Sequence, residues 1–133
     1  ALDDISKEGC LECIVGSHLS NILHKPKRFN GKDLYENDNS LEVPDIDSNR
    51  AKYKIMSWDI KAGDAIAFDF RTLHGASKNV DRISRRRVFS ARIVGDDAFF
   101  VDRQGKGSPP FENVKLQTGD KLSGEDFPVI YPL

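Results

Sequence analysis

The sequence predicts a mainly β protein, built as an antiparallel sandwich or a jelly roll. Short apolar segments, several with a period of two, alternate with turn-forming residues along much of the chain. Neither a long amphipathic helix nor an internal repeat is recognisable. Of the 133 residues, 38% are hydrophobic, so one domain spanning residues 1–133 could bury a core. A layered β domain is the architecture that these observations favour.

Three strands are expected in the first half of the chain. The apolar run at residues 11–15 ends at a glycine, and a second run at residues 55–60 contains the single tryptophan. Residues 65–70 alternate small or polar side chains with large apolar ones, which is the pattern of a strand with one packed face. Between the first two runs, residues 19–24 fit either a single helical turn or a loop.

One more strand and two irregular segments are expected in the remainder. Residues 86–94 repeat the alternation, with Phe89 and Ile93 on one face. Residues 25–54 are polar and hold several turn-forming clusters, which predict a long loop excursion, and residues 95–133 predict a turn-rich tail. Loops of such length inside a compact domain often cover a site or bind a ligand.

The balanced charge argues against several classes of partner. Twenty basic and twenty-one acidic residues give a formal charge of −1, without the basic excess of a nucleic-acid-binding protein. No apolar run approaches the roughly 18 residues of a membrane span, and no signal sequence is visible. We therefore expect no nucleic-acid partner, no membrane association and a cytoplasmic location. The opening Ala1-Leu2-Asp3-Asp4 reads like the interior of a domain, so we expect a segment before it.

Cys10 and Cys13 form a Cys-x-x-Cys pair, a spacing that serves both redox dithiols and half of a zinc site. Tetrahedral zinc needs two more ligands, and the chain has no further cysteine. A redox dithiol usually opens a helix after a strand, whereas here the cysteines lead into a strand-like run. We therefore expect reduced cysteines that pack as small apolar side chains.

The most informative stretch combines a histidine with a cluster of arginines. His74 lies just past the predicted strand at 65–70, and Arg85, Arg86 and Arg87 follow eleven to thirteen residues later. This spacing can bring a metal ligand and an anion-binding cation to one pocket, which points to iron chemistry. A facial site for non-haem Fe(II) uses two histidines and one carboxylate and leaves positions open for co-substrate and oxygen. The stretch supplies only part of that set.

A series of short motifs resembles the C-terminal half of the phytanoyl-CoA dioxygenase family over about residues 1–94. The motifs, in order, are Ala1-Leu2-Asp3-Asp4, Glu8-Gly9-Cys10-Leu11, Val15-Gly16-Ser17-His18, Gly63-Asp64-Ala65, Phe68-Asp69, Leu73-His74-Gly75 and Asn79. The resemblance implies a double-stranded β-helix, which is a cupin-like jelly roll, of which this chain holds an incomplete part. It also implies an oxidoreductase that uses Fe(II) and the co-substrate 2-oxoglutarate on a small-molecule substrate.

The resemblance assigns roles to residues of the central stretch. His74 matches the distal iron-binding histidine of the family. The family's co-substrate arginine matches Arg86 when the following strand is aligned on Ser90, and Arg85 when residues are counted from His74. We prefer Arg86, because strand parity decides which side chains enter the barrel. A planar, permanently charged guanidinium suits a carboxylate because it can donate two parallel hydrogen bonds.

Two departures from the family pattern bear on activity. The family's His-Gly-Ser is His74-Gly75-Ala76 here, so a hydroxyl that helps to hold the co-substrate is absent or displaced to Ser77. The family's first metal motif, His-x-Asp or His-x-Glu, lies before the matching segment, so two of the three expected iron ligands are not in this chain. His18 and His24 do not replace them, because neither is followed by a carboxylate two positions on.

Several functional alternatives stay open. The resemblance implies a hydroxylase, but related halogenases have the same fold. Because the first metal motif is not in this chain, the chain could also be an inactive fragment. A non-catalytic cupin-like module could bind a small anionic or sugar ligand through Arg71 and Arg85–Arg87. Half of a jelly roll leaves strand edges uncovered, so we expect a homodimer or a domain swap that covers them.

Overall fold

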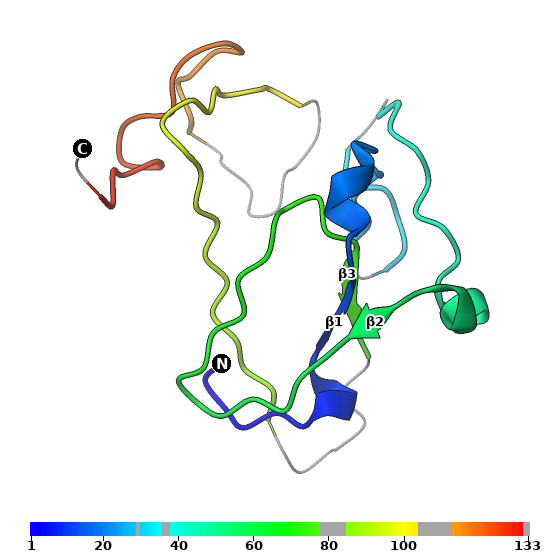
Figure 1. The fold of residues 1–133 in the computed structure, drawn as a ribbon. Coiled ribbons are helices and arrows are strands. Elements are labelled where there is room, and N and C mark those ends of the chain that lie inside the picture. Colours follow the sequence, from blue (N-terminus) through cyan, green and yellow to red (C-terminus); the bar gives the residue numbers. More distant parts are fainter. Residues whose placement is uncertain (29, 36–37, 78–84, 104–112, 132–133) are drawn as a thin grey trace. The chain divides into compact units, whose positions relative to one another are not determined.

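The computed structural model describes residues 1–28, 30–35, 38–77, 85–103 and 113–131 (Figure 1). It divides into two compact units, one formed by residues 1–24 and 40–91 and the other by residues 25–39 and 92–133. The described chain is mostly non-helical and contains a small antiparallel sheet, which supports the predicted β-rich class. The strands are β1 (Leu11–Ile14), β2 (Ile55–Met56) and β3 (His74–Ala76).

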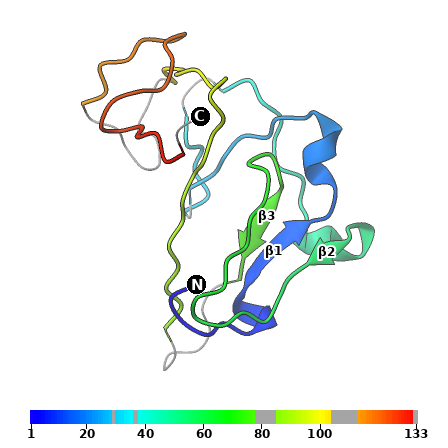
Figure 2. The ribbon, with the colours of Figure 1, turned by 60° about the vertical axis from the view of Figure 1, so that its left-hand side comes forward.

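The sheet belongs to the first unit and has the order β2-β1-β3, with β1 in the centre (Figures 1 and 2). Both pairings are antiparallel, and Cys13 of β1 lies opposite Met56 on one side and His74 on the other. Directly paired residues of neighbouring strands carry their side chains on the same face. The sheet therefore places His74, Cys13 and Met56 on one face.

A second backbone contact holds the N-terminal segment beside the residues that follow β2. Ile5 and Ile60 exchange two hydrogen bonds of 2.9 and 3.0 Å. Ile5 is only 7% exposed, and the other buried hydrophobic residues of the described chain are Cys10 and Cys13. The core of the first unit thus lies between its N-terminal segment and β1.

The structure corrects the expected strands in part. The strand predicted at 11–15 is confirmed as β1, whereas the one predicted at 55–60 is reduced to β2 and the isolated bridge of Ile60. The strands predicted at 65–70 and 86–94 are wrong, since neither segment is paired as a strand. Alternating side chains favour an extended backbone, but a strand also needs a neighbour to accept its hydrogen bonds. Large side chains of these segments are accordingly exposed, such as Phe70 at 81% and Phe89 at 79%.

The helices of the described chain are short 3-10 turns. They are η1 (Lys7–Gly9), η2 (Ser17–Ser20) and η3 (Asp47–Lys52). Residues 19–24 were expected to form a helical turn or a loop, and the helical turn that the structure has nearby, η2, begins two residues earlier and ends at Ser20. Asn21, which follows it, is in the left-handed conformation with φ 53°. Among the described residues, no helix has the length and apolar character needed to cross a membrane.

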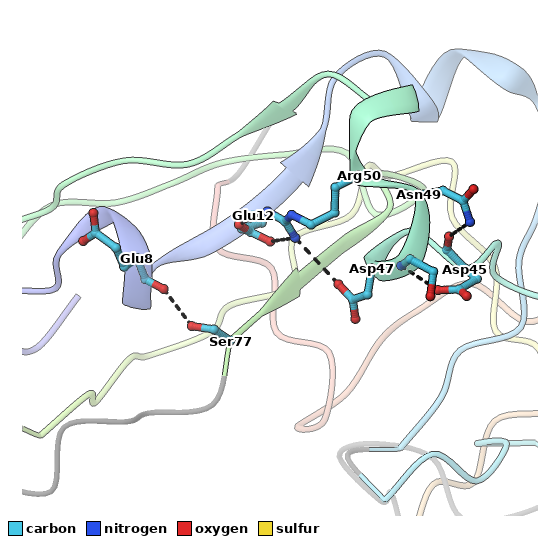
Figure 3. Close-up of polar contacts among 8 residues, drawn as sticks. Glu8, Glu12, Asp45, Asp47, Asn49, Arg50 and Ser77 are labelled. Carbon is cyan, nitrogen blue, oxygen red and sulfur yellow. Dashed lines mark hydrogen bonds and ion pairs between the residues drawn. The ribbon is translucent and has the colours of Figure 1, made fainter.

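An ion pair fastens η3 to the sheet (Figure 3). The two terminal nitrogens of Arg50 donate to the two carboxylate oxygens of Glu12 on β1, at 2.6 and 3.0 Å. This pairing lowers the pKa of Glu12 from its ordinary value, chiefly through the hydrogen bonds from Arg50. Arg50 also lies 3.6 Å from Asp47 of η3. The segment at 25–54, predicted as a loop, thus contains a helix that contacts β1.

The second unit contains two isolated bridges among its described residues. Lys27 and Asp33 form an isolated bridge and an ion pair across a turn at Gly31, whose φ of 79° suits a residue without a side chain. In the tail, Phe99 and Lys121 form another isolated bridge.

Candidate active site

His74 lies on β3 with its imidazole held at one ring nitrogen. Nδ1 is 2.7 Å from the carbonyl oxygen of Thr72. Because a carbonyl oxygen only accepts hydrogen bonds, Nδ1 carries the proton, and in the neutral ring the lone pair is on Nε2. The ring of Phe68 packs against the imidazole, with 4.8 Å between the ring centroids. His74 is exposed, so Nε2 is the nitrogen that it can offer to a metal.

Arg86 reaches the backbone at the end of β3. Its Nη1 donates to the carbonyl oxygens of Gly9, at 2.8 Å, and Ser77, at 2.7 Å. Ser77 follows β3 directly, so the structure brings Arg86 to the strand that carries His74. Arg86 is half-buried, unlike its exposed neighbours Arg85 and Arg87. These contacts hold the guanidinium in one orientation.

Arg87 is bound to a carboxylate instead. Its side chain donates to Asp3 with the shortest distance 2.7 Å, and its backbone N–H donates to the same carboxylate at 2.7 Å. These hydrogen bonds lower the pKa of Asp3 from 3.8 to about 2, to which the positive charge of Arg85 also contributes. Arg85 and Arg87 thus act on Asp3, whereas Arg86 contacts Gly9 and Ser77.

Arg71 has a partner of the same kind. Its Nε and Nη2 donate to the two oxygens of Asp69 at 3.1 and 3.0 Å, and its backbone N–H donates as well. Hydrogen bonds from Arg71 lower the pKa of Asp69 to about 2. The anion-binding alternative relied on Arg71 and the cluster Arg85–Arg87. Two of those four arginines already neutralise aspartates, which weakens that alternative.

Ser77 has its hydroxyl turned toward the chain. Its Oγ donates to the carbonyl oxygen of Glu8 at 2.7 Å (Figure 3). A hydroxyl has one proton, so in this arrangement Ser77 can accept a hydrogen bond but cannot donate one to a carboxylate. The arrangement gives Ser77 a structural contact between β3 and η1.

The described residues supply one imidazole for iron. Within residues 1–28, 30–35, 38–77, 85–103 and 113–131, no group of three or more histidine, cysteine, aspartate or glutamate side chains could hold a metal ion. The Nδ1 of His24 lies 3.0 Å from the carbonyl oxygen of Glu42, away from β3 in the chain. The residues described here therefore fit a contribution to an iron site, not a complete one.

Cys10 and Cys13 are free and buried, which confirms the expectation of packed, reduced cysteines. Cys10 has an extended backbone and β1 begins at the next residue. Three extended residues separate Cα atoms by about 10 Å, which is beyond the roughly 7 Å limit of a disulfide. Burial, and less strongly the neighbouring Cys10, raises the pKa of the Cys13 thiol, so it is a weak nucleophile at neutral pH.

Sequence reasoning missed the residues that hold this arrangement. Thr72 and Phe68 orient His74, and Asp3 fixes Arg87, although Asp3 lies 84 positions away in the chain. A local signal existed for Phe68 alone, since the Phe68-Asp69 motif stands six residues before the histidine. The contact of Thr72 with His74 is made by its backbone oxygen, which every residue type has, so the sequence could not predict it.

An antiparallel sheet with an exposed imidazole on one strand, and with an arginine bound to the backbone at the end of that strand, fits an Fe(II)- and 2-oxoglutarate-type dioxygenase. A family model described as phytanoyl-CoA dioxygenase (PhyH) matches residues 1–87, a stretch that includes His74 and the three arginines. The chain belongs to the phytanoyl-CoA dioxygenase family, whose members generally depend on Fe(II) and 2-oxoglutarate. The family resemblance of the sequence is thereby confirmed. No curated protein and no solved structure matches the chain.

The Asp3–Arg87 pair predicts a loss of stability in acid. The pKa of Asp3 is about 2 in the folded chain and near its ordinary 3.8 when unfolded, so the folded state binds fewer protons between these values. The stabilisation is present above pH 3.8 and is lost as the pH falls toward about 2. In urea unfolding at a series of pH values, Asp3→Asn is expected to flatten this decline. Glu125→Gln, an exposed site, controls for net charge, and equal acid slopes in Asp3→Asn and the unaltered chain would contradict the prediction.

Proposed function

We propose that this chain supplies the distal iron ligand, His74, and the 2-oxoglutarate clamp, Arg86, of a jelly-roll dioxygenase that hydroxylates a small molecule. Family membership over residues 1–87 carries the proposal. The three-stranded antiparallel sheet forms part of the jelly-roll wall in this proposal, and its His74 face is the side turned toward the substrate.

The chemistry of His74 supports its role as a ligand. Iron binds a neutral imidazole through a lone pair, and the hydrogen bond from Nδ1 to Thr72 leaves that lone pair on Nε2. Metal-bound histidines usually donate their other N–H to a carbonyl or carboxylate, which fixes the tautomer and the ring orientation. The packing of Phe68 against the ring restricts its rotation further.

The contacts of the arginines support Arg86 as the clamp. Among the described residues, its hydrogen bonds engage Nη1, so the other guanidinium N–H groups can bind a carboxylate. Arg87 forms an ion pair with Asp3, so its charge is already neutralised. Arg85 is exposed, and its positive charge also stabilises the carboxylate of Asp3. Arg86 is also the arginine tied to Ser77, at the end of the strand that carries His74.

When bound, Fe(II) and 2-oxoglutarate would allow dioxygen, the oxidant, to react: the co-substrate would give up two electrons as it becomes succinate and carbon dioxide, and the substrate would give up two as it is hydroxylated. The part of this chain is to place one ligand and to fix the far carboxylate of the co-substrate. Two further iron ligands are required for a complete facial site.

Anaerobic absorption spectroscopy tests the proposal. The full-length gene product, mixed with Fe(II) and 2-oxoglutarate without oxygen, is expected to show the visible charge-transfer band of the iron-bound co-substrate. His74→Ala should abolish the band, because it removes a metal ligand. His24→Ala is a matched control, since His24 also has its Nδ1 beside a backbone carbonyl oxygen and should keep the band. A band that persists in His74→Ala would overturn the assignment of His74.

A further inference from the structure

We propose that Ser17 is a positioning residue for His74, acting through the peptide group that joins Thr72 to Leu73. The inference rests on the proposed role of His74 as an iron ligand. Ser17 belongs to the Val15-Gly16-Ser17-His18 motif, which has no part in the iron and co-substrate roles proposed above.

A tight turn brings the Ser17 hydroxyl back over the end of β1. Gly16, with φ 79°, adopts the left-handed conformation between β1 and η2. The Oγ of Ser17 donates to the carbonyl oxygen of Ile14 at 2.8 Å and accepts from the N–H of Leu73 at 2.9 Å. Because a carbonyl oxygen only accepts and an amide N–H only donates, the direction of both hydrogen bonds is fixed.

One peptide plane connects this hydroxyl to the imidazole. The N–H of Leu73 and the C=O of Thr72 belong to the same planar group. Ser17 holds its N–H end, and Nδ1 of His74 donates to its C=O end at 2.7 Å. A rotation of the plane that breaks one hydrogen bond also disturbs the other. All the donations run in one direction, from His74 through the peptide group and Ser17 to Ile14, so each hydrogen bond polarises the next.

The same contact fixes the register of β3. The N–H of Ile14 donates to the carbonyl oxygen of Leu73 at 2.9 Å, so both polar backbone groups of Leu73 are tied to the β1 end. β3 has three residues, which leaves few other ladder bonds to set its alignment. A slip of one residue would turn His74 to the opposite face of the sheet. Ser17 thus controls both the side of the sheet on which His74 lies and the nitrogen that it presents.

Nitrogen NMR of His74 tests the proposal without iron. In the unaltered protein the neutral ring should be the Nδ1–H tautomer. Ser17→Ala should shift the population toward the Nε2–H tautomer, whereas Ser17→Thr, which keeps a hydroxyl, should restore the original state. Ser20→Ala is the matched control, because Ser20 donates to the Ser17 carbonyl in the same turn and has no bond to Leu73.

A metal titration gives the second measurement. With 2-oxoglutarate present and oxygen excluded, Ser17→Ala should weaken Fe(II) binding about tenfold, the usual effect of losing a group that orients a ligand. Ser17→Thr and Ser20→Ala should bind as the unaltered protein does.

The outcomes separate this proposal from the one on which it rests. An unchanged His74 tautomer in folded Ser17→Ala overturns the positioning role, whatever the iron result. A His74→Ala protein that keeps its charge-transfer band overturns the metal role and leaves the tautomer result standing. If Ser17→Ala does not fold, Ser17→Cys, with a similar volume and a weaker hydrogen-bonding group, decides by the same two measurements.

Discussion

Replacement of Arg86 by glutamine is expected to weaken 2-oxoglutarate binding about 30- to 150-fold. A hydrogen bond to a charged group contributes about 2–3 kcal/mol, and each 1.4 kcal/mol is about a factor of ten in affinity. Glutamine can still donate to a carboxylate, but it has neither the positive charge nor the two parallel N–H groups of a guanidinium. Anaerobic titration with 2-oxoglutarate in the presence of Fe(II), followed by absorption or calorimetry, measures the change.

Two further variants make the Arg86 result specific. Arg85→Gln removes the same charge one position earlier and should change the affinity by less than about threefold, as an exposed charge does. Arg86→Lys keeps the positive charge but lacks the planar guanidinium, so its affinity for 2-oxoglutarate should lie between those of Arg86→Gln and Arg85→Gln. Arg86 also holds the carbonyl oxygens of Gly9 and Ser77, so thermal unfolding must show that each variant is folded. Lost binding in Arg85→Gln with normal binding in Arg86→Gln would transfer the clamp to Arg85.

Replacement of Ile5 by alanine is expected to lower the free energy of unfolding by about 2–4 kcal/mol. Ile5 is 7% exposed, and its Cγ2 is the nearest side-chain atom to the space where Gly9 would carry a Cβ. The side chain is one of few buried apolar groups in the described chain, while its backbone keeps the bridge to Ile60 in the variant. Urea unfolding followed by circular dichroism measures the loss.

The matched control for this prediction is an isoleucine on the surface. Ile93 is 72% exposed, and Ile93→Ala should change the unfolding free energy by less than about 0.5 kcal/mol. Equal effects of the two substitutions would show that Ile5 does not belong to the core of the first unit.

Local patterns in the sequence predicted the part of the fold that local interactions determine. The apolar run that becomes β1 and the turn after it were predicted, because a strand ended by a left-handed glycine leaves a visible mark. The same kind of pattern failed at 65–70 and 86–94. An extended segment becomes a strand only where another segment lies beside it, and that pairing depends on residues far away in the chain.

The residues of the candidate site could be predicted from the sequence only through the family motifs. The roles of His74 and Arg86 came from the order of family motifs, and residue types alone left three arginines to choose from. The preference for Arg86 relied on the parity of a strand at 86–94 that the structure does not form. The contact of Arg87 with Asp3, which separates Arg87 from Arg86, became visible only in the structure. The link from Ser17 to His74 runs through backbone atoms, so no pattern of side chains could have shown it.

The central position of β1 has a consequence for how the chain is made. The neighbours of β1, which are β2 and β3, begin at Ile55 and His74, so both are synthesised after β1. Ribosomes add about 5–20 residues per second, so the roughly 60 residues between β1 and β3 take about 3–12 seconds to appear. Both pairing edges of β1 lack their partner strands until β2 appears, and the edge that pairs with β3 lacks its partner for the whole interval, so other chains and chaperones can bind there. The sheet is complete only when the strand that carries His74 has been synthesised, so its assembly depends on a pairing between residues far apart in the chain.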